Sequence, residues 1–310
     1  MVSNHTRHPS DLLSNKDKKA SNDFCVMVPR LLYNPDARGL PMKIACFMSG
    51  SGTNVTKIIE YELSSAQRDE SCPYDVVLIF TDVKDERLDS EGRKTCFAKD
   101  ISQRFRIPYI CNDIRDFYRS KGHKTIRNLS LRQEFDEITL GRIKEYEVDA
   151  LALGGYNSII TRPLLDVFPD RIVNVHPADL SVMEEERRKY VGLHGVRDAI
   201  LAGEPYIYST TFIVRPAPLR QNVDAGEILM RSPPVEVWIP SGLALEDLRN
   251  PENRALLDEV EARNQKNLKE RGDWVVFPGT LEMIARGRYS IDDKGNVYVD
   301  GRLEPYGFRL

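Results

Sequence analysis

The segment "KIACFMSGSGTNVTKIIEYEL", residues 43–63, decides the fold class because its pattern changes twice over a short distance. Residues 43–48 form a continuous apolar run, which predicts a short buried strand. Residues 50–54 are small or polar, and the following residues place apolar side chains at helical spacing. A strand, a glycine-containing turn and a helix in this order are typical of parallel α/β folds.

The same alternation continues along the chain. Short apolar runs at residues 74–82, 107–111, 149–155 and 171–176 predict further strands, and amphipathic segments between them predict helices. Residues 206–214 and 227–237 also predict strands, residues 244–271 a long charged helix, and residues 292–301 a hairpin. We therefore predict an α/β, Rossmann-like fold with a mostly parallel central sheet and flanking helices.

Composition excludes several classes of protein. The 310 residues carry a formal net charge of −3 without a long block of one sign, so we expect no nucleic-acid partner. No apolar run approaches ~20 residues, so we expect no membrane span. The cysteines show no metal-ligand spacing, which predicts no metal site and a reduced, cytoplasmic protein. Residues 1–40 are polar and irregular and predict an N-terminal extension before a domain of residues 41–310.

The glycine loop "GSGTN", residues 50–54, is a candidate anion site. Small residues at Gly50 and Gly52 let the backbone approach a ligand, and the following helix offers free N–H groups. Thr53 and Asn54 add side-chain donors. The loop is neither a complete dinucleotide fingerprint, since Val55 replaces a third glycine, nor a P-loop. A tight turn with a helix cap explains the loop as well as phosphate binding does.

An amide and an imidazole follow each other in the run "RIVNVHP", residues 171–177. Asn174 and His176 are two positions apart, so their side chains share one face of the predicted strand. Pro177 ends the strand, which places both at the carboxyl edge where α/β proteins bind ligands. The alternative is a hydrogen-bonded polar pair that only caps the strand.

A carboxylate follows further along the chain, in "NVDAGEIL". Asp224 precedes Gly226 and a predicted strand, so it also lies at a strand end. An amide and a protonated imidazole stabilise a developing oxyanion, and a carboxylate keeps the imidazole charged and takes up an amine proton. If the three residues converge, the set suits acyl transfer to an amine.

These motifs, in this order, resemble those of the folate-dependent formyltransferases. The shared elements are the first strand, the GSGTN loop, the "LALGG" strand at 151–155, N-V-H-P at 174–177, G-L-H at 192–194 and D-A-G at 224–226. The resemblance covers roughly residues 43–300 and is greatest to the members that formylate glycinamide ribonucleotide. It implies a formyltransferase domain over residues 41–310.

The resemblance also implies roles for individual residues. It makes Asn174, His176 and Asp224 catalytic and His194 a supporting residue. The predicted substrate-binding residues, for phosphate and ribose, are Gly50, Gly52, Thr53, Asn54 and Asp273, where Asp273 stands in place of a family glutamate. The predicted folate-binding residues are Tyr156, Asn157, Ser158, Ile159 and Arg132, where Ser158 replaces an arginine and Arg132 supplies a cation.

Two segments depart from the family pattern. Residues 178–191 are several residues longer and include the charge run "EEERRK", 184–189, which predicts a solvated helix face within a lid that orders over bound ligand. Residues 215–223, in a loop that holds the pterin in the family, are also longer than usual.

The resemblance implies formyl transfer from 10-formyltetrahydrofolate, as donor, to the primary amine of a phosphorylated substrate, with glycinamide ribonucleotide as the best candidate. Three alternatives stay open: hydrolysis of the donor, formylation of a nucleotide-linked amino sugar, and a non-catalytic nucleotide-binding role. The expected partners are small molecules, together with a second copy of the chain in a homodimer. A dinucleotide oxidoreductase is disfavoured by the incomplete fingerprint.

Overall fold

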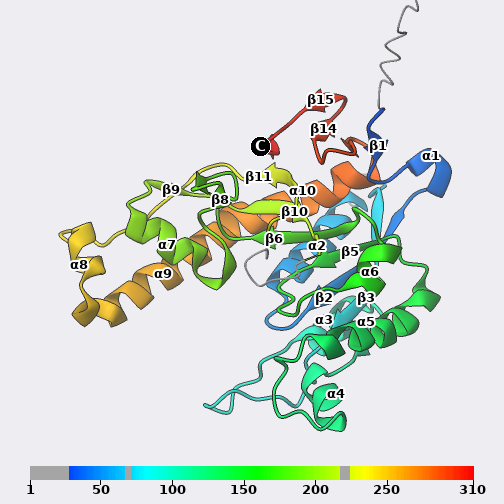
Figure 1. Ribbon diagram of the computed structural model, residues 1–310, viewed down its shortest axis with the longest axis horizontal. Helices are drawn as coiled ribbons and strands as arrows, with labels where there is room; N and C mark the ends of the chain where they lie inside the picture. Colours follow the sequence, from blue (N-terminus) through cyan, green and yellow to red (C-terminus); the bar gives the residue numbers. More distant parts are fainter. Residues whose placement is uncertain (1–27, 67–70, 217–223) are drawn as a thin grey trace, which may run out of the picture.

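A computed structural model describes residues 28–66, 71–216 and 224–310, and a large central sheet organises this part of the chain (Figure 1). The sheet has eight strands in the order β16-β11-β10-β6-β5-β2-β3-β4. The neighbours among β2 to β6 pair in parallel, whereas β10 pairs antiparallel with both β6 and β11. This arrangement confirms the predicted mostly parallel sheet. The strands are β2 (Met42–Met48), β3 (Tyr74–Thr81), β4 (Tyr109–Cys111), β5 (Ala150–Leu153), β6 (Ile172–His176), β10 (Thr210–Ile213), β11 (Ile228–Arg231) and β16 (Phe308–Arg309).

Helices cover both faces of the sheet, and the alternation along β2 shows why. Ile44 and Cys46 pack on one face with α2 (Thr53–Ala66), α3 (Ala98–Phe105) and α10 (Trp274–Ala285). Ala45 and Phe47 pack on the other face with α4 (Ile114–Ser120), α5 (Ser130–Ile143) and α6 (Arg162–Val167). A strand buried on both faces needs a continuous apolar run, which residues 44–48 supply.

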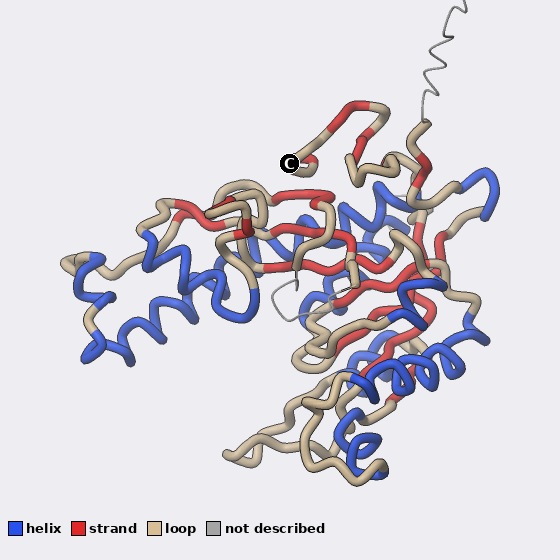
Figure 2. Tube along the Cα trace, viewed as in Figure 1, coloured by secondary structure: helices blue, strands red, loops and turns tan. Residues whose placement is uncertain are grey.

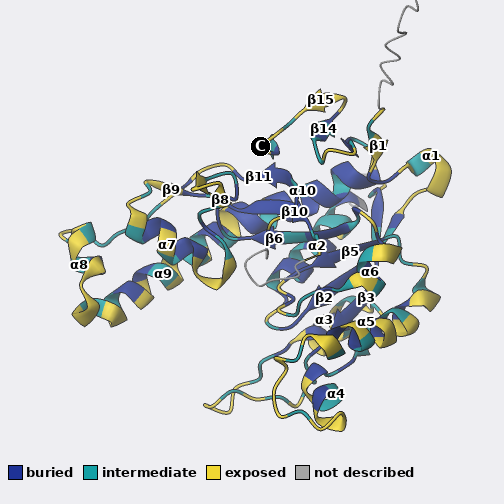
Figure 3. Ribbon diagram, viewed as in Figure 1, coloured by how far each residue is buried: buried dark blue, intermediate teal, exposed yellow. Residues whose placement is uncertain are grey.

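A second, smaller core lies beside the sheet. Figure 1 shows α7 (Gly195–Ala202), α8 (Leu245–Arg249) and α9 (Arg254–Leu268) extending away from the sheet, and Figure 3 shows buried inner and exposed outer surfaces on these helices. They bury Val196, Ile200 and Val260 together with β9 (Tyr206–Ile207) and β12 (Val235–Glu236). The single helix predicted over 244–271 is interrupted, because Pro251 starts a separate short turn between α8 and α9.

The residues just before the central sheet are part of the folded body. β1 (Arg30–Leu31) pairs with β13 (Tyr289–Ile291), which continues through β14 (Val297–Val299) to β15 (Arg302–Leu303). Leu32 and Tyr33 are buried in the main core. The folded body thus includes residues 30–33, within the extension predicted over residues 1–40, and the hairpin predicted around residues 292–301 is confirmed. Residues 1–27 lie outside the described part.

Long loops follow several strands at the carboxyl edge of the sheet. Figure 2 shows the loop of residues 82–97, between β3 and α3, extending beside α4. Arg87 in this loop forms a two-oxygen contact with Asp113 at the start of α4, at 2.8 and 2.7 Å. This edge is where ligands bind in open α/β sheets.

Candidate active site

The imidazole of His176 and the carboxylate of Asp224 meet at the end of β6. His176 Nδ1 lies 3.6 Å from Asp224 Oδ2, although 48 positions separate the residues in the numbering. Both are buried, with 5% and 9% of their surface exposed. The convergence expected from the sequence is therefore present in the fold.

Asn174 lies on the same face of β6, two positions before His176. It is partly buried, and its backbone pairs with Leu153 of β5 and Phe212 of β10. Its side-chain amide has no hydrogen-bond partner within the described residues. A strand-end pair that served only as a cap would use this amide within the protein. The amide is instead available to a ligand.

Residues 183–188 form a hairpin, so the predicted helix face is wrong. β7 (Met183–Glu184) pairs antiparallel with β8 (Arg187–Arg188). Glu185 and Glu186 adopt positive φ angles of 48° and 62°, the conformation of a tight two-residue hairpin turn. Arg188 then reaches back to the D-A-G turn, where its guanidinium donates to the backbone carbonyl of Asp224 and to that of Gly226, the latter at 2.6 Å.

The residues after the hairpin fix both members of the His176–Asp224 pair. The Tyr190 carbonyl oxygen lies 3.0 Å from His176 Nε2 and accepts a hydrogen bond from it. The Gly192 N–H donates to Asp224 Oδ2 at 3.0 Å. The segment 188–192 is thus anchored by four hydrogen bonds, so the lid predicted over 178–191 is fixed at its C-terminal end.

The protonation state of His176 differs from the sequence-based expectation. Burial lowers the pKa of His176 from its usual 6.5, although Asp224 and the Tyr190 carbonyl act in the opposite direction. The expected upward contribution of Asp224 is present, but desolvation of the cation is larger. The direction of this shift favours the neutral imidazole, and the nearby Tyr190 carbonyl favours the tautomer with its proton on Nε2.

Two glycines allow the chain to approach this pair. A Cβ at Gly226 would lie 1.6 Å from the Ile213 carbonyl oxygen, so D-A-G requires glycine there. A Cβ at Gly195 would lie 3.2 Å from His176 Nε2, so the start of α7 packs against the imidazole. The sequence reasoning missed Gly195, although a glycine that opens a helix was an available signal.

The glycine loop has the conformation expected of a close backbone approach. Gly52 has a φ of +66°, and a Cβ there would lie 2.4 Å from Ile101 Cδ1. α2 begins at Thr53, and the Thr56 N–H donates to the Gly52 carbonyl at 2.8 Å. The preceding amides stand at the helix N-terminus, where they attract anions. A Cβ added at Gly50 would have no other atom within 4 Å.

Asp273 joins the glycine loop to Ser209, the residue before β10, and is almost fully buried. It lies in the π-helical turn of Lys269–Asp273 before α10, with 4% of its surface exposed. Its carboxylate accepts from Ser209 Oγ at 2.5 Å and from Asn54 Nδ2 at 3.1 Å. Burial raises the pKa of this carboxyl group. In this state both of its oxygens have protein donors, so direct contact with a ribose requires a change of partners.

Arg132, which was expected to supply a cation to folate, is buried and has partners within the protein. Only 2% of its surface is exposed. It donates to the Ile159 carbonyl at 2.6 Å and to the Tyr156 hydroxyl at 2.7 Å, and lies 3.1 Å from Asp136. Through these two hydrogen bonds, the buried guanidinium holds residues 156–159 in position. The sequence spacing gave no sign of this burial.

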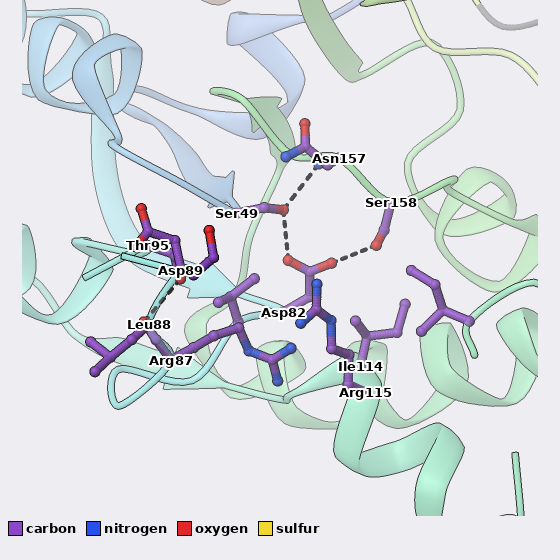
Figure 4. A pocket seen from close by; sticks show the side chains of 13 residues that line it. Ser49, Asp82, Arg87, Leu88, Asp89, Thr95, Ile114, Arg115, Asn157 and Ser158 are labelled. Carbon is purple, nitrogen blue, oxygen red and sulfur yellow. Dashed lines mark hydrogen bonds between the residues drawn. The ribbon is translucent and has the colours of Figure 1, made fainter. Parts of the chain in front are cut away.

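Asn157 and Ser158 line a pocket of ≈ 480 Å³ at the ends of β2 and β3 (Figure 4). The Asn157 N–H donates to Ser49 Oγ at 3.0 Å, and Ser49 Oγ donates to Asp82 Oδ1 at 2.6 Å. Ser158 Oγ donates to the other oxygen of Asp82 at 2.5 Å. The predicted folate-binding segment thus forms one wall of this pocket, held by Asp82.

His194 does not contact the pair that it was expected to support. Its side chain is 66% exposed, and its closest carboxylate is Glu261, 4.0 Å away. The G-L-H segment acts on Asp224 through the Gly192 backbone instead. Residues 217–223, in the loop expected to hold the pterin, lie outside the described part.

Neither a metal centre nor a membrane segment is found in the described ranges. No group of three or more His, Cys, Asp or Glu residues there is placed to hold a metal ion. No helix between residues 28 and 310, apart from the two gaps, is long and apolar enough to cross a bilayer.

The fold resembles solved structures of glycinamide ribonucleotide transformylases. The Coxiella burnetii phosphoribosylglycinamide formyltransferase superposes with a TM-score of 0.56 at 20% identity, over 87% of this chain and 99% of that one. Glycinamide ribonucleotide transformylase 1 of Symbiobacterium toebii gives 0.54 at 24%, over 83% and 93%. A formyltetrahydrofolate deformylase from Pseudomonas syringae gives 0.52 at 14%, over 83% and 65%. The predicted fold class is confirmed.

Sequence relatives lead to the same family. The chloroplastic phosphoribosylglycinamide formyltransferase of Arabidopsis thaliana is 30% identical over 239 residues, 75% of this chain and 69% of that protein. The Haemophilus influenzae phosphoribosylglycinamide formyltransferase is 25% identical over 263 residues, 85% of this chain and 96% of that protein. The family model described as formyl transferase matches residues 42–250. The chain belongs to the formyl transferase family.

Proposed function

We propose that the chain transfers the formyl group of 10-formyltetrahydrofolate to the primary amine of glycinamide ribonucleotide, a step of purine biosynthesis. The observation that carries the proposal is the meeting of His176, Asp224 and the unpartnered amide of Asn174 at one strand end. The names of the sequence relatives favour glycinamide ribonucleotide as the amine.

The chemistry begins with attack of the amine nitrogen on the formyl carbon. The Asn174 amide donates a hydrogen bond to the oxyanion that develops on the formyl oxygen. The amine loses a proton to the His176–Asp224 pair, whose Nδ1 is free to accept it. The imidazolium that forms is stabilised by Asp224, and it returns the proton to the leaving folate nitrogen as the carbon–nitrogen bond breaks.

The substrate phosphate binds at the glycine loop. α2 begins at Thr53, directly after the loop, and its helix dipole favours an anion at that end. Asn54 ties this loop to Asp273 at 3.1 Å, and its Oδ1 is buried without a partner within the described residues. A ligand hydroxyl that donates to Asn54 Oδ1 satisfies this atom. Because Asn54 Oδ1 is buried, direct contact with ribose requires a local rearrangement at Asn54 as it does at Asp273.

Two other formyl acceptors remain to be compared with glycinamide ribonucleotide. Water as acceptor gives hydrolysis of the donor, and the fold alone does not separate the two reactions, since a deformylase shares it. A nucleotide-linked amino sugar is the other. The glycine loop favours a phosphorylated amine, because hydrolysis needs no phosphate site.

A transfer assay with a panel of acceptors tests the proposal. Purified protein is mixed with 10-formyltetrahydrofolate labelled in the formyl group, and with glycinamide ribonucleotide, a nucleotide-linked amino sugar or buffer alone. We expect label in the formamide of glycinamide ribonucleotide and little in free formate. If labelled formate is released at the same rate with and without the amine, the protein is a hydrolase. If label appears only in the amino sugar, the protein is an amino-sugar formyltransferase.

A further inference from the structure

Three side chains form a row across the strands next to the candidate active site. Thr210 of β10 is the register partner of His176 on β6 and of Arg231 on β11. Residues directly opposite each other on antiparallel strands project from the same face of a sheet, so the three side chains are neighbours. Each of them contacts the segment that follows His176, and the row therefore connects the imidazole to the course of residues 178–190.

Arg231 forms a buried ion pair with Asp179, three positions after His176. Its Nη1 lies 3.2 and 3.0 Å from the two carboxylate oxygens, and the two side chains are 6% and 13% exposed. The same Nη1 donates to Ser181 Oγ at 2.6 Å. The hydroxyl and the backbone N–H of Ser181 both donate to Asp179 Oδ1, at 2.6 and 2.9 Å. Arg231 and Asp179 together therefore fix the side chain and the backbone of residue 181.

Thr210 fixes the backbone of the same turn. Its fully buried hydroxyl donates to the Ala178 carbonyl at 2.7 Å and accepts from the Leu180 N–H at 3.3 Å. The turn of residues 178–181 is thus held to β10 by Thr210 and to β11 by Arg231. A turn with this many buried partners has one well-defined conformation.

Ala178 connects this turn to the imidazole through the first residue of α7. A Cβ at Gly195 would lie 2.9 Å from Ala178 Cβ and 3.2 Å from His176 Nε2. The Gly195 backbone therefore packs against both residues. Because protein interiors are close-packed, a shift of residue 178 displaces the start of α7 relative to the imidazole ring.

We propose that Asp179 and Arg231 are positioning residues for the reaction, because their ion pair fixes the turn of residues 178–181 and, through it, the place of the His176 imidazole. The inference rests on the proposed function, in which His176 takes up the amine proton. The two residues act through the turn rather than by contact with the reacting atoms. Arg231 holds the beginning of the loop that follows β6, as Arg188 holds its end.

The test compares Asp179→Ala with a matched control at the other end of the same strand. Asp170 lies two positions before β6, its side chain is 5% exposed, and it pairs with Arg30 and Arg215 at 2.5 Å each. Both substitutions therefore remove a buried carboxylate that has an arginine partner. Asp170→Ala should destabilise the fold at least as much, because Asp170 has a positive φ of 61°. Only Asp179 follows the end of β6 that carries His176.

Two further variants separate geometry from stability. Asp179→Asn keeps an oxygen that accepts from Ser181 and Arg231. The double variant Asp179→Leu with Arg231→Met removes both charges together, so no unpaired charge stays buried and the protein should fold. Each protein is measured for melting temperature, for kcat and KM of formyl transfer to glycinamide ribonucleotide, and for the imidazole NMR signals of His176, which are assigned with His176→Gln.

We expect Asp179→Ala and the double variant to lower kcat about tenfold with little change in KM, because the imidazole is misplaced rather than removed. The NMR signals of His176 should shift in both. Asp179→Asn should keep most of the kcat. The control Asp170→Ala should melt at a lower temperature but keep its kcat and its His176 signals.

A near-normal kcat in the folded double variant overturns the inference, and so does a loss of kcat in Asp170→Ala as large as in Asp179→Ala. The NMR measurement needs no substrate, so it separates this inference from the proposed function. If the parent protein formylates no glycinamide ribonucleotide, the proposed function fails. In that case a shift of the His176 signals in the double variant still supports the positioning role, and unshifted signals overturn it.

Discussion

His176 lies at the end of β6, near the middle of the central sheet, and Arg115 lies on α4, which follows β4 at one end of the sheet; their surroundings differ. Around His176, backbone groups of Tyr190 and Gly192 hold the imidazole and the Asp224 carboxylate at 3.0 Å each. Arg115 itself and the nearby Lys124 and Arg127 are exposed and have no carboxylate partner within the described residues, whereas Arg119 pairs with Asp116. The side chains around His176 are held in place by buried hydrogen bonds, whereas the region around Arg115 presents exposed positive charge.

This difference separates two kinds of binding energy. Bond formation depends on sub-ångström placement, which buried backbone contacts provide. Recognition of a flexible anionic chain needs only a favourable field, in which each exposed charge contributes little and is screened by salt. Substitutions near His176 should therefore mainly lower kcat. Substitutions near Arg115 should mainly weaken the binding of an anionic ligand.

The largest expected effect is at Asn174, whose amide has no protein partner. Asn174→Ala should lower kcat by about 10²–10³, the usual effect of removing one oxyanion donor. The melting temperature should stay near that of the parent protein, because no internal hydrogen bond is lost. Steady-state kinetics and thermal unfolding on one preparation check both. A lower melting temperature with near-normal kcat would make Asn174 a structural residue.

A smaller effect is expected at Arg188, which acts through the D-A-G turn. Arg188→Ala removes the donors to the Asp224 and Gly226 carbonyls, so the carboxylate shifts and kcat should fall about tenfold. The KM of both substrates should change little. The adjacent Arg187→Ala is the control, because Arg187 is exposed. Equal effects of the two substitutions on kcat would show that the contact does not position Asp224.

The glycine loop lies between these two regions. Its two glycines, Gly50 and Gly52, should contribute very differently to the stability of the fold. Gly52→Ala forces a Cβ into a backbone with φ +66° and toward Ile101, so the free energy of unfolding should fall by about 1–3 kcal/mol. Gly50→Ala meets open space and should change it far less. Urea titration of both variants measures the difference, and equal losses would refute this reading of Gly52.

The smallest effect concerns pH. Because burial lowers the pKa of His176, the unfolded chain binds more protons than the folded one just below the usual value of 6.5. This group therefore contributes stability at neutral pH that is lost as the pH falls through that region. Urea midpoints at about pH 7.5 and about pH 5.5 should differ less in His176→Gln than in the parent protein. An unchanged difference would show that His176 is not buried as a neutral ring.

Local patterns in the sequence were sufficient for most of the fold. The strand–loop–helix pattern of residues 43–63 predicted β2 and α2, because the apolar spacing of each element is local. The alternation of side chains placed Asn174 and His176 on one face of β6 for the same reason. The hairpin at 183–188 was not predicted, because its turn residues are glutamates at positive φ.

The site residues that were missed act across long sequence separations. Arg188 reaches the carbonyl of Asp224, 36 positions later, and nothing in the run "EEERRK" distinguishes it from its neighbours. Arg132 was expected to face folate, but burial depends on how α5 packs against residues 156–159. The pKa of His176 depends on a balance between burial and the Asp224 charge, which composition and spacing do not reveal.

The most direct test of the account is Asp224→Asn, measured for melting temperature, ligand Kd and kcat on the same preparation. Asparagine keeps the size and one acceptor oxygen, so folding and ligand binding should stay nearly intact. It loses the charge that stabilises the imidazolium, so kcat for formyl transfer to glycinamide ribonucleotide should fall at least ~100-fold. A stable variant that transfers the formyl group at a near-normal rate would contradict the central claim that the His176–Asp224 pair carries the proton.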